Sequence, residues 1–332
     1  MPYFLLTGAG FSYNWGGYLA SEAFEVLLSI TDGDDDFRKL LWRGHQARLG
    51  FEDILAKPQA EYEAGWTAQR EQDLRNLTAG VQRMFGIMAQ AFREISLGPP
   101  GVADFLAKFD AIFTLNQDTL LEEHFLQQID QNGLQQSSEF PTLRAAYRPG
   151  VVRAHDSFTY GGVGDRIELY KPDDNLTTIP GLQPYIKLHG SIDIKRSDRE
   201  MMLIIGGNKA ANIVQQPLLK WYSEMFQERL RSRGARLMII GYSFGDAHIN
   251  QTIFSGVDAG LKLFIIDPKG VDVIGSNRSL PLNPEFRIRN AIIGASRRPL
   301  RTTLSGMDRV ELNKINRFFR SGHIAVPEPP GS

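Results

Sequence analysis

Short apolar runs recur along the chain, and each of them ends at a polar or glycine-containing turn. The runs are Tyr3–Leu6, Ala111–Leu115, Tyr185–Leu188, Met201–Ile205, Leu237–Ile240 and Leu261–Ile266. Short runs of this kind, rich in β-branched residues, are typical of buried strands, and helical patterns separate several of them. This alternation predicts an α/β fold with a mostly parallel sheet flanked by helices.

A long segment between the first two predicted strands has a helical period instead. Apolar residues recur there at three- and four-residue steps and form one stripe: Leu74, Leu77, Val81, Met84, Phe85, Met88, Phe92 and Ile95. Such a stripe is more typical of a helix packed on a core than of a cofactor site. Residues 19–109 are therefore predicted to form a helical insertion after the first strand and its turn.

The rest of the chain consists of segments that differ in composition. Residues 132–184 contain many turn-forming residues and few periodic runs, which predicts a small lobe of loops and strands. The main domain is predicted over residues 1–280, followed by a C-terminal extension over 281–325 that contains a helix at Asp308–Phe319. Proline and glycine dominate residues 326–332, which favours a disordered tail.

Bulk composition narrows the class of protein. The 332 residues are 42% hydrophobic, which is enough for a sizeable core, and a formal net charge of -1 gives no global attraction to nucleic acid or to an anionic membrane. The chain has no cysteine, which excludes disulfides, thiolate nucleophiles and cysteine-ligated zinc. Neither a signal-peptide pattern nor an apolar run of transmembrane length occurs. We expect a cytoplasmic protein and no metal cofactor.

The first apolar run ends at a glycine-rich turn, Gly8-Ala9-Gly10-Phe11-Ser12. A strand, a glycine turn and a helix together are the layout of a phosphate site, because glycine lets the backbone approach a ligand and the helix presents N–H groups to an anion. The usual dinucleotide fingerprint is incomplete, since no third glycine follows at the required spacing. A strand-ending turn without a ligand is the alternative.

Four further polar segments follow predicted strands, at the ends where parallel sheets bind ligands. They are Thr114-Leu115-Asn116-Gln117-Asp118, Lys187-Leu188-His189-Gly190-Ser191, Gly241-Tyr242-Ser243-Phe244-Gly245-Asp246 and Ile266-Asp267-Pro268. An amide, carboxylates, a histidine and glycine-flanked N–H groups would thus meet along one edge of the sheet. That edge is the predicted site.

Each segment also has a simpler explanation. Asn116 or Asp118 is explained as a helix cap, Asp246 as an N-cap, and Asp267 as the start of an Asp-Pro turn. His189 is explained as a structural histidine, although a histidine at a strand end, with space left beside it by a glycine, can also act as a base. The other histidines have no comparable setting: His45, His124, His155, His248 and His323.

Taken in order, the five segments resemble the motifs of the sirtuin (silent information regulator) family, and most of all those of the bacterial sirtuin-like NAD hydrolases of anti-phage defence. The resemblance covers residues 3–270 and implies a Rossmann-like sheet with an NAD site at the carboxyl ends of its strands. By this resemblance the Gly8–Ser12 turn holds the pyrophosphate. Gly241 and Ser243 support the phosphates, and Asp267 lies near the adenosine.

The resemblance also implies a chemistry. It places Asn116 and Asp118 at the nicotinamide and its ribose, and His189 at the ribose hydroxyls. The nicotinamide–ribose bond breaks through a cation-like transition state and the leaving group departs neutral, so the site has to orient the reactants and place a water. A carboxamide can orient that water, and a neutral histidine can accept its proton. We therefore expect hydrolysis of NAD to ADP-ribose and nicotinamide, with these three residues as the catalytic ones.

Several departures separate the chain from deacylating sirtuins. It cannot form their four-cysteine zinc module, Leu115 stands where they have a glutamine, and Tyr13–Tyr18 replaces their cofactor loop. The defence enzymes share these absences. Two alternatives stay open: a non-catalytic module that binds NAD or ADP-ribose, and an ADP-ribosyltransferase or deacylase. By resemblance we expect a homo-oligomer, with a HerA-type ATPase or a short Argonaute as a candidate separate activator.

Overall fold

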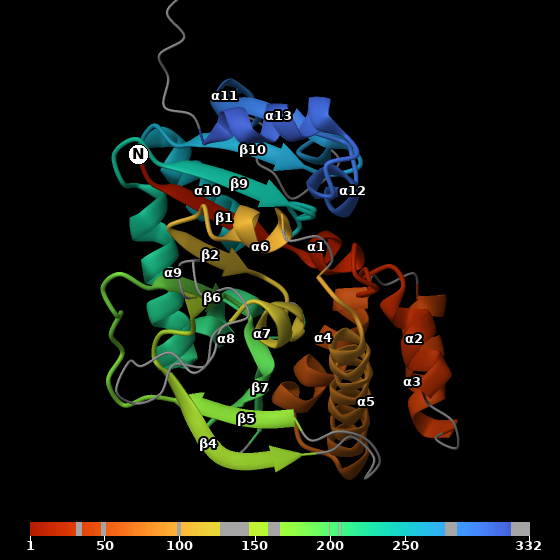
Figure 1. The fold of residues 1–332 in the computed structure, drawn as a ribbon. Coiled ribbons are helices and arrows are strands. Elements are labelled where there is room, and N and C mark those ends of the chain that lie inside the picture. Colours follow the sequence, from red (N-terminus) through yellow and green to blue (C-terminus); the bar gives the residue numbers. More distant parts are fainter. Residues whose placement is uncertain are drawn as a thin grey trace, which may run out of the picture.

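A seven-stranded parallel sheet forms the centre of the molecule in a computed structural model (Figure 1), which describes residues 1–30, 35–47, 51–97, 101–126, 146–158, 167–198, 200–204, 206, 208–275 and 284–319. The strand order is β11-β10-β9-β1-β2-β6-β3, and every neighbouring pair runs parallel. The strands are β1 Tyr3–Thr7, β2 Ala111–Thr114, β3 Ala146–Tyr147, β6 Gln183–Lys187, β9 Arg236–Ile240, β10 Lys262–Ile266 and β11 Ile292–Ser296. The predicted α/β fold with a mostly parallel sheet is confirmed.

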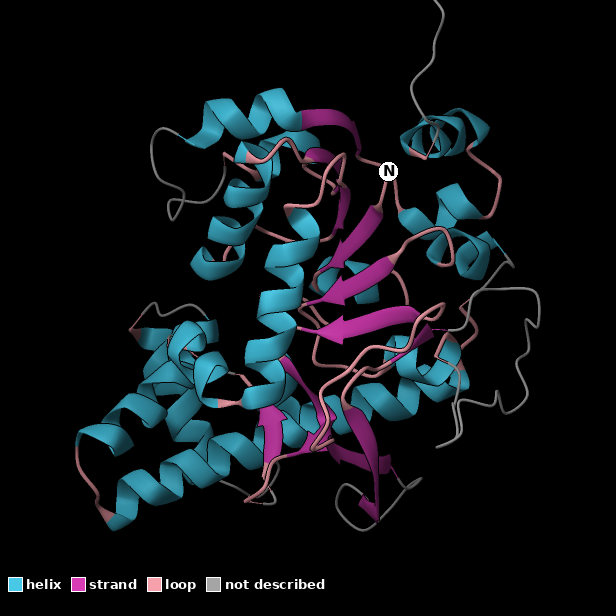
Figure 2. Cartoon of the chain, turned by 90° about the vertical axis from the view of Figure 1, so that its left-hand side faces the viewer, coloured by secondary structure: helices cyan, strands magenta, loops and turns pink. Residues whose placement is uncertain are grey.

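Helices cover both faces of this sheet (Figure 2). Alternate residues of a strand point to opposite faces, so Phe4 and Leu6 of β1 pack into one apolar layer and Leu5 into the other. The first layer is completed by helices α8 Lys209–Gln215, α9 Pro217–Leu230, α10 Ala247–Asp258 and α11 Pro284–Ala291. The second is completed by α1 Ala9–Tyr13, α6 Gly101–Leu106, α7 Leu120–His124, α12 Leu300–Leu304 and α13 Arg309–Phe318.

The segment between β1 and β2 is helical, as predicted. After the short α1, it contains α2 Ala23–Ile30, α3 Asp35–Gln46, α4 Phe51–Ala64 and α5 Ala68–Glu94. They enclose a small core of their own, to which α5 contributes Leu77, Val81 and Met84. Further along α5, Met88 and Phe92 pack into the second layer of the main sheet. The apolar stripe therefore fixes the insertion to the sheet, which agrees with its interpretation as a core-facing helix.

A second, four-stranded sheet lies below the main one in Figure 1. Its order is β4-β5-β7-β8, with strands β4 Val151–Phe158, β5 Ile167–Pro172, β7 Gly190–Lys195 and β8 Met201–Leu203. The apolar run at Met201 was predicted as one more strand of the parallel sheet, but β8 pairs antiparallel with β7 in this smaller sheet. A short apolar run specifies a strand without specifying its partner.

The last strand of the main sheet, β11, was not predicted. It pairs with β10 in the register Ile265↔Ala295, so part of the segment predicted as a C-terminal extension belongs to the sheet. Gly294 interrupts its apolar pattern because a Cβ there would lie 2.5 Å from the ring of Phe264. The predicted tail and His323 lie outside the described residues. None of the helices within the described ranges combines the length and the apolar character needed to cross a bilayer.

Candidate functional site

A cleft of about 880 Å³ opens at the carboxyl ends of β1, β2, β9 and β10 and beside the end of β6. Carboxyl ends of parallel strands share one edge of a sheet, so segments distant in sequence meet there. The lining includes most of the predicted site residues: Gly8, Ala9, Gly10, Asn116, Asp118, His189, Gly241, Ser243 and Asp267. The helical insertion supplies an apolar wall through Ala23, Val81 and Met84.

The two glycine turns pack against each other, which gives their glycines a role that the sequence did not predict. The Gly10 N–H donates to the Gly241 carbonyl at 3.0 Å, and a Cβ on Gly10 would lie 2.7 Å from the Gly241 Cα. Gly241 has a φ of +62°, a conformation that glycine adopts without strain. The N–H groups of Gly8 and Phe11 also donate to backbone carbonyls. The first turn therefore shapes the cleft, and three of its donors are already used within the protein.

Phe11 and Ser12 lie behind the cleft rather than in its lining. Both are buried, and the Phe11 ring packs on Trp15 with ring centroids 5.0 Å apart. The Ser12 Oγ accepts a hydrogen bond from the Asn116 Nδ2 at 2.9 Å. Ser12 thus holds a neighbouring side chain, whereas the sequence suggested a contact with phosphate.

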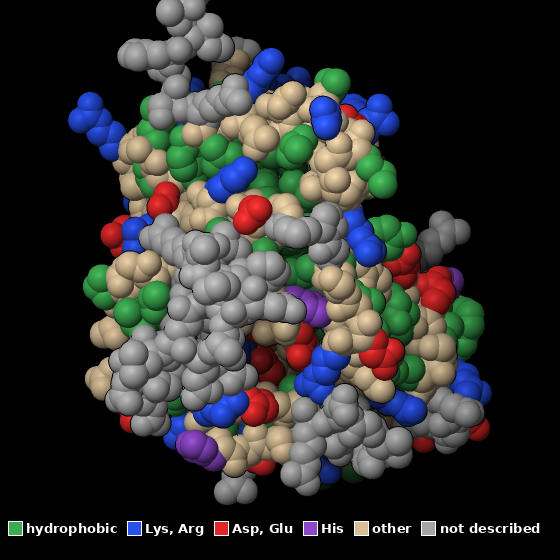
Figure 3. All heavy atoms as spheres, in the orientation of Figure 1, with side chains coloured by type: hydrophobic (Ala, Val, Ile, Leu, Met, Phe, Trp, Pro, Cys, Tyr) green, Lys and Arg blue, Asp and Glu red, His purple; other side chains and the backbone are tan. Residues whose placement is uncertain are grey.

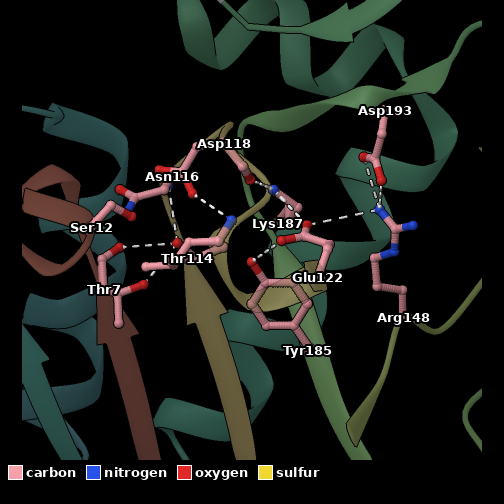
Figure 4. A network of polar contacts seen from close by, with 11 residues as sticks. Thr7, Ser12, Thr114, Asn116, Asp118, Glu122, Arg148, Tyr185, Lys187 and Asp193 are labelled. Atoms are coloured by element: carbon pink, nitrogen blue, oxygen red, sulfur yellow. Dashed lines mark hydrogen bonds and ion pairs between the residues drawn. The ribbon is translucent and has the colours of Figure 1, made fainter. Parts of the chain in front are cut away.

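Asn116 is fixed by hydrogen bonds at the end of β2 (Figure 4). Its backbone N–H donates to the Thr114 Oγ1 at 3.0 Å, and Thr114 in turn accepts from the Thr7 hydroxyl at 2.7 Å. Since the Nδ2 is engaged by Ser12, the Oδ1 of the carboxamide is the acceptor available to a ligand. The helix-cap explanation does not apply to Asn116. Nor does it apply to Asp118, because the N-cap position of α7 is Thr119; the Asp118 Oδ1, on the residue before the cap, accepts from the Leu120 N–H at 3.1 Å.

His189 lies between β6 and β7 and is only 4% exposed. Its carbonyl accepts from the Gln117 Nε2 at 2.9 Å and from the Ile204 N–H at 3.0 Å, which holds the backbone in place. Burial lowers the pKa of His189 to about 3, so the ring is neutral near pH 7. The following Gly190 does not leave open space, as the sequence suggested. A side chain there would collide with the Met202 carbonyl.

His248 and Asp246 were misread from the sequence, and Lys209 was missed. The His248 Nε2 lies 3.1 Å from the His189 Nε2, so the statement that His248 has no comparable setting is wrong. Asp246 occupies the N-cap position of α10, but its side chain makes no cap hydrogen bond and pairs with the Lys209 Nζ at 2.7 Å. Burial acts to raise the pKa of Asp246, and the charges of the histidines and Lys209 outweigh it, so the pKa is lowered. The sequence did contain a signal for His248, because this histidine comes just after a predicted strand, a turn and the start of a helix.

The far end of the cleft lies at the end of β10. There the Asp267 Oδ1 accepts from the Lys269 N–H at 2.8 Å, so the turn explanation for Asp267 holds. Ser243 is exposed in the same cleft. Arg297 and Arg298, which follow β11, complete this end and were not predicted because β11 was not.

Next to Asn116, a network of buried charges connects the end of β2, β6 and the small sheet (Figure 4). The Lys187 Nζ binds the Glu122 Oε1 at 2.6 Å and the Asp118 carbonyl. Arg148 binds both carboxylate oxygens of Asp193, at 2.9 and 2.8 Å. Burial raises the pKa of Glu122 despite the Lys187 charge. Burial also acts to raise the pKa of Asp193, but the charges of Arg148 and Lys187 outweigh it and lower the pKa.

A second cavity of about 850 Å³ lies beside this network and the small sheet. Glu122, Arg148 and Asp193 are in its lining. The face seen in Figure 3 is hollowed in its lower half, with acidic and basic side chains around the hollow. The acidic and basic side chains of the buried network are paired with one another. We therefore interpret the network as structural support for the strand ends and not as a ligand site.

Residues 110–271 match a family model described as the SIR2-like domain. This match supports the sirtuin resemblance over that part of the chain. The matched range starts at β2 and includes Asn116, His189, Gly241 and Asp267, whereas the first glycine turn lies before it. No curated protein matches the chain.

Solved structures of Sir2 homologues show a distant likeness. A crystal structure of a Sir2 homologue–NAD complex is 15% identical, with 95% of this chain and 90% of that chain covered and a TM-score of 0.40. A mutant Sir2 homologue in complex with 2′-O-acetyl ADP-ribose is 12% identical, with 97% and 94% covered and a TM-score of 0.39.

Proposed function

We propose that the chain is an NAD hydrolase that cleaves NAD to ADP-ribose and nicotinamide. The observation that carries the proposal is the convergence of Asn116 and His189 on one cleft with both glycine turns, in a chain that matches the SIR2-like domain model over residues 110–271. A cleft of about 880 Å³ is in the range of small-molecule and cofactor sites.

The nicotinamide ribose is assigned to the part of the cleft that Asn116, Asp118 and His189 line. In the proposed reaction the C–N bond to nicotinamide breaks, the bonding pair leaves with the neutral pyridine, and a water oxygen bonds to the ribose C1. The Asn116 Oδ1 orients that water or a ribose hydroxyl. The neutral His189 ring accepts the proton that the water loses. Asp118, whose side chain already accepts from the Leu120 N–H, is the candidate partner of the nicotinamide amide.

The rest of the dinucleotide extends towards Asp267. The pyrophosphate is assigned to the glycine turns at Gly10 and Gly241, where the lack of a side chain on these two residues lets it approach the backbone closely. Ser243 is an exposed hydroxyl beside it. Asp267 is assigned to accept hydrogen bonds from the adenosine ribose, because it lines the cleft at the carboxyl end of a strand, where parallel sheets bind ligands.

Incubation of the purified chain with NAD tests the proposal, with products separated by liquid chromatography and identified by mass. We expect equal amounts of free ADP-ribose and nicotinamide. Retained NAD binding without turnover, at every protein concentration, would support the non-catalytic module instead. ADP-ribose found covalently on protein, with free nicotinamide, would support a transferase.

Ser12→Ala is expected to lower kcat by about 2- to 10-fold and to leave KM nearly unchanged. The Ser12 Oγ fixes the Asn116 carboxamide through one hydrogen bond, and one such bond contributes about 0.5–1.5 kcal/mol. If Ser12 bound the pyrophosphate instead, as the sequence suggested, KM would rise. Steady-state kinetics with NAD decide between the two, and Ser29→Ala, on α2 and outside the cleft lining, is the control.

The biological role follows from the same resemblance to defence enzymes. Loss of NAD harms the host cell, so such an enzyme has to stay inactive until it is triggered. We propose a role in anti-phage defence with activation by self-assembly or by a separate protein, for which a HerA-type ATPase and a short Argonaute are the candidates. A specific activity that does not change with protein concentration or with either candidate partner would contradict this.

A further inference from the structure

His189, Asp246 and His248 form a compact group at one side of the cleft. His189 follows β6, Asp246 stands at the N-cap of α10, and His248 is in the first turn of that helix. One nitrogen or oxygen from each side chain lies within 4.8 Å of those of the other two, and the Nε2 atoms of the two rings are 3.1 Å apart. His189 is buried, and the other two side chains are partly buried.

The spacing of the two ring nitrogens is close to that of two ligands of one metal ion. Two imidazole nitrogens bound to tetrahedral zinc at its usual bond length are about 3.3 Å apart. Two histidines and one carboxylate, with a fourth position left to water, are a common ligand set for an open zinc site. Burial lowers the pKa of both rings, and a neutral ring is the form that binds a metal.

We propose that His189, Asp246 and His248 bind a divalent metal ion of the zinc type, with the fourth position open to the cleft. The absence of cysteine makes a nitrogen–oxygen ligand set the only kind available to this chain. His189 and Asp246 line the cleft, which gives an ion a path of entry.

Lys209 limits the affinity of this site. Its ammonium binds the Asp246 Oδ1 at 2.7 Å, and a positive charge so near disfavours a second cation. A carboxylate has a second oxygen with which to coordinate the ion. The site is therefore reversible, and it is occupied only when the free metal concentration rises.

One consequence rests on the proposed hydrolase function. Metal coordination uses the Nε2 lone pair of His189, and a coordinated ring cannot accept a proton from the attacking water. Bound zinc therefore inhibits NAD cleavage.

Titration of the full chain with Zn²⁺ against a chromogenic chelator tests the binding itself, whether or not the chain cleaves NAD. We expect one ion per chain. We expect the affinity for Zn²⁺ to be at least about tenfold weaker in His248→Ala and in Asp246→Asn, because removing even a residue that only hydrogen-bonds to a metal ligand weakens metal binding by that much. Lys209→Met is expected to bind more tightly. Co²⁺ in place of Zn²⁺ is expected to give the visible absorption of a tetrahedral site, lost in both weakened variants.

His155→Asn is the matched control for a lost histidine. His155 is exposed, lies outside the group and has a φ of +52°, which asparagine tolerates. Unchanged Zn²⁺ affinity in His248→Ala and Asp246→Asn, with both variants folded by thermal melting, would overturn the proposal. Zinc inhibition of turnover that persists in His248→Ala would overturn only the inhibitory consequence.

Discussion

Asn116→Ala is expected to lower kcat for NAD cleavage by about 10²- to 10³-fold, the loss typical of removing one preorganised polar group at a reacting centre. The carboxamide is held by Ser12 at its Nδ2 and by Thr114 at its backbone, so its Oδ1 needs no reorganisation when the ribose becomes cation-like. KM for NAD is expected to change much less, because the group acts mainly in the transition state. Steady-state kinetics with detection of free nicotinamide give both values.

Asn76→Ala is the matched control. Asn76 lies on α5, outside the cleft lining, and accepts a hydrogen bond from the Gln72 side chain. It should keep wild-type kcat. If Asn116→Ala also keeps it while binding NAD normally, the assigned role of Asn116 is wrong.

A double variant tests whether Asn116 and His189 act in the same step. Groups that act together in one step are not additive. Adding His189→Ala to Asn116→Ala is therefore expected to lower kcat little beyond the more damaging single change. Losses that multiply would mean that the two side chains act in separate steps.

The strand ends of the site could be predicted from the sequence because their signal is local. An apolar run that stops at Asn116, His189 or Asp267 identifies both a strand and the direction in which it ends. Parallel strands then bring those ends to one edge, whatever the order of the strands. The helical insertion was equally visible, because the stripe on α5 repeats over many turns.

The rest of the site depends on contacts between residues far apart in the sequence, which no local pattern encodes. Gly10 and Gly241 are glycines because two turns, far apart in sequence, touch each other. His248 has its role because α10 begins beside the end of β6. The use of three N–H donors of the first turn within the protein could not be predicted for the same reason, since the Gly241 carbonyl that accepts one of them is far away in the sequence. Strand β11 was missed because Gly294 makes room for Phe264, a contact between neighbouring strands.

Lys187→Met is expected to lower the free energy of unfolding by about 3–5 kcal/mol, the cost typical of removing one partner from a buried ion pair. The Lys187 side chain is 1% exposed and that of Glu122 is 8% exposed. Methionine fills similar space, so the loss reports the Glu122 charge left without its closest partner. The Asp118 carbonyl loses a donor too, and Asp118 lines the cleft, so NAD cleavage is expected to fall as well. Urea denaturation followed by circular dichroism gives the free energy.

Two further variants test whether the unpaired charge of Glu122 causes the loss of stability in Lys187→Met. Adding Glu122→Gln to Lys187→Met should recover part of the lost stability, because no unpaired carboxylate then stays buried. The glutamine can still accept a hydrogen bond from the Tyr185 hydroxyl. Arg153→Met removes an ion pair with Glu168 whose side chains are 49% and 53% exposed, and it should cost less than about 1 kcal/mol. If Lys187→Met costs no more than Arg153→Met, the buried network does not support the strand ends. A double variant less stable than Lys187→Met would show that lost packing, and not the unpaired charge, causes the loss.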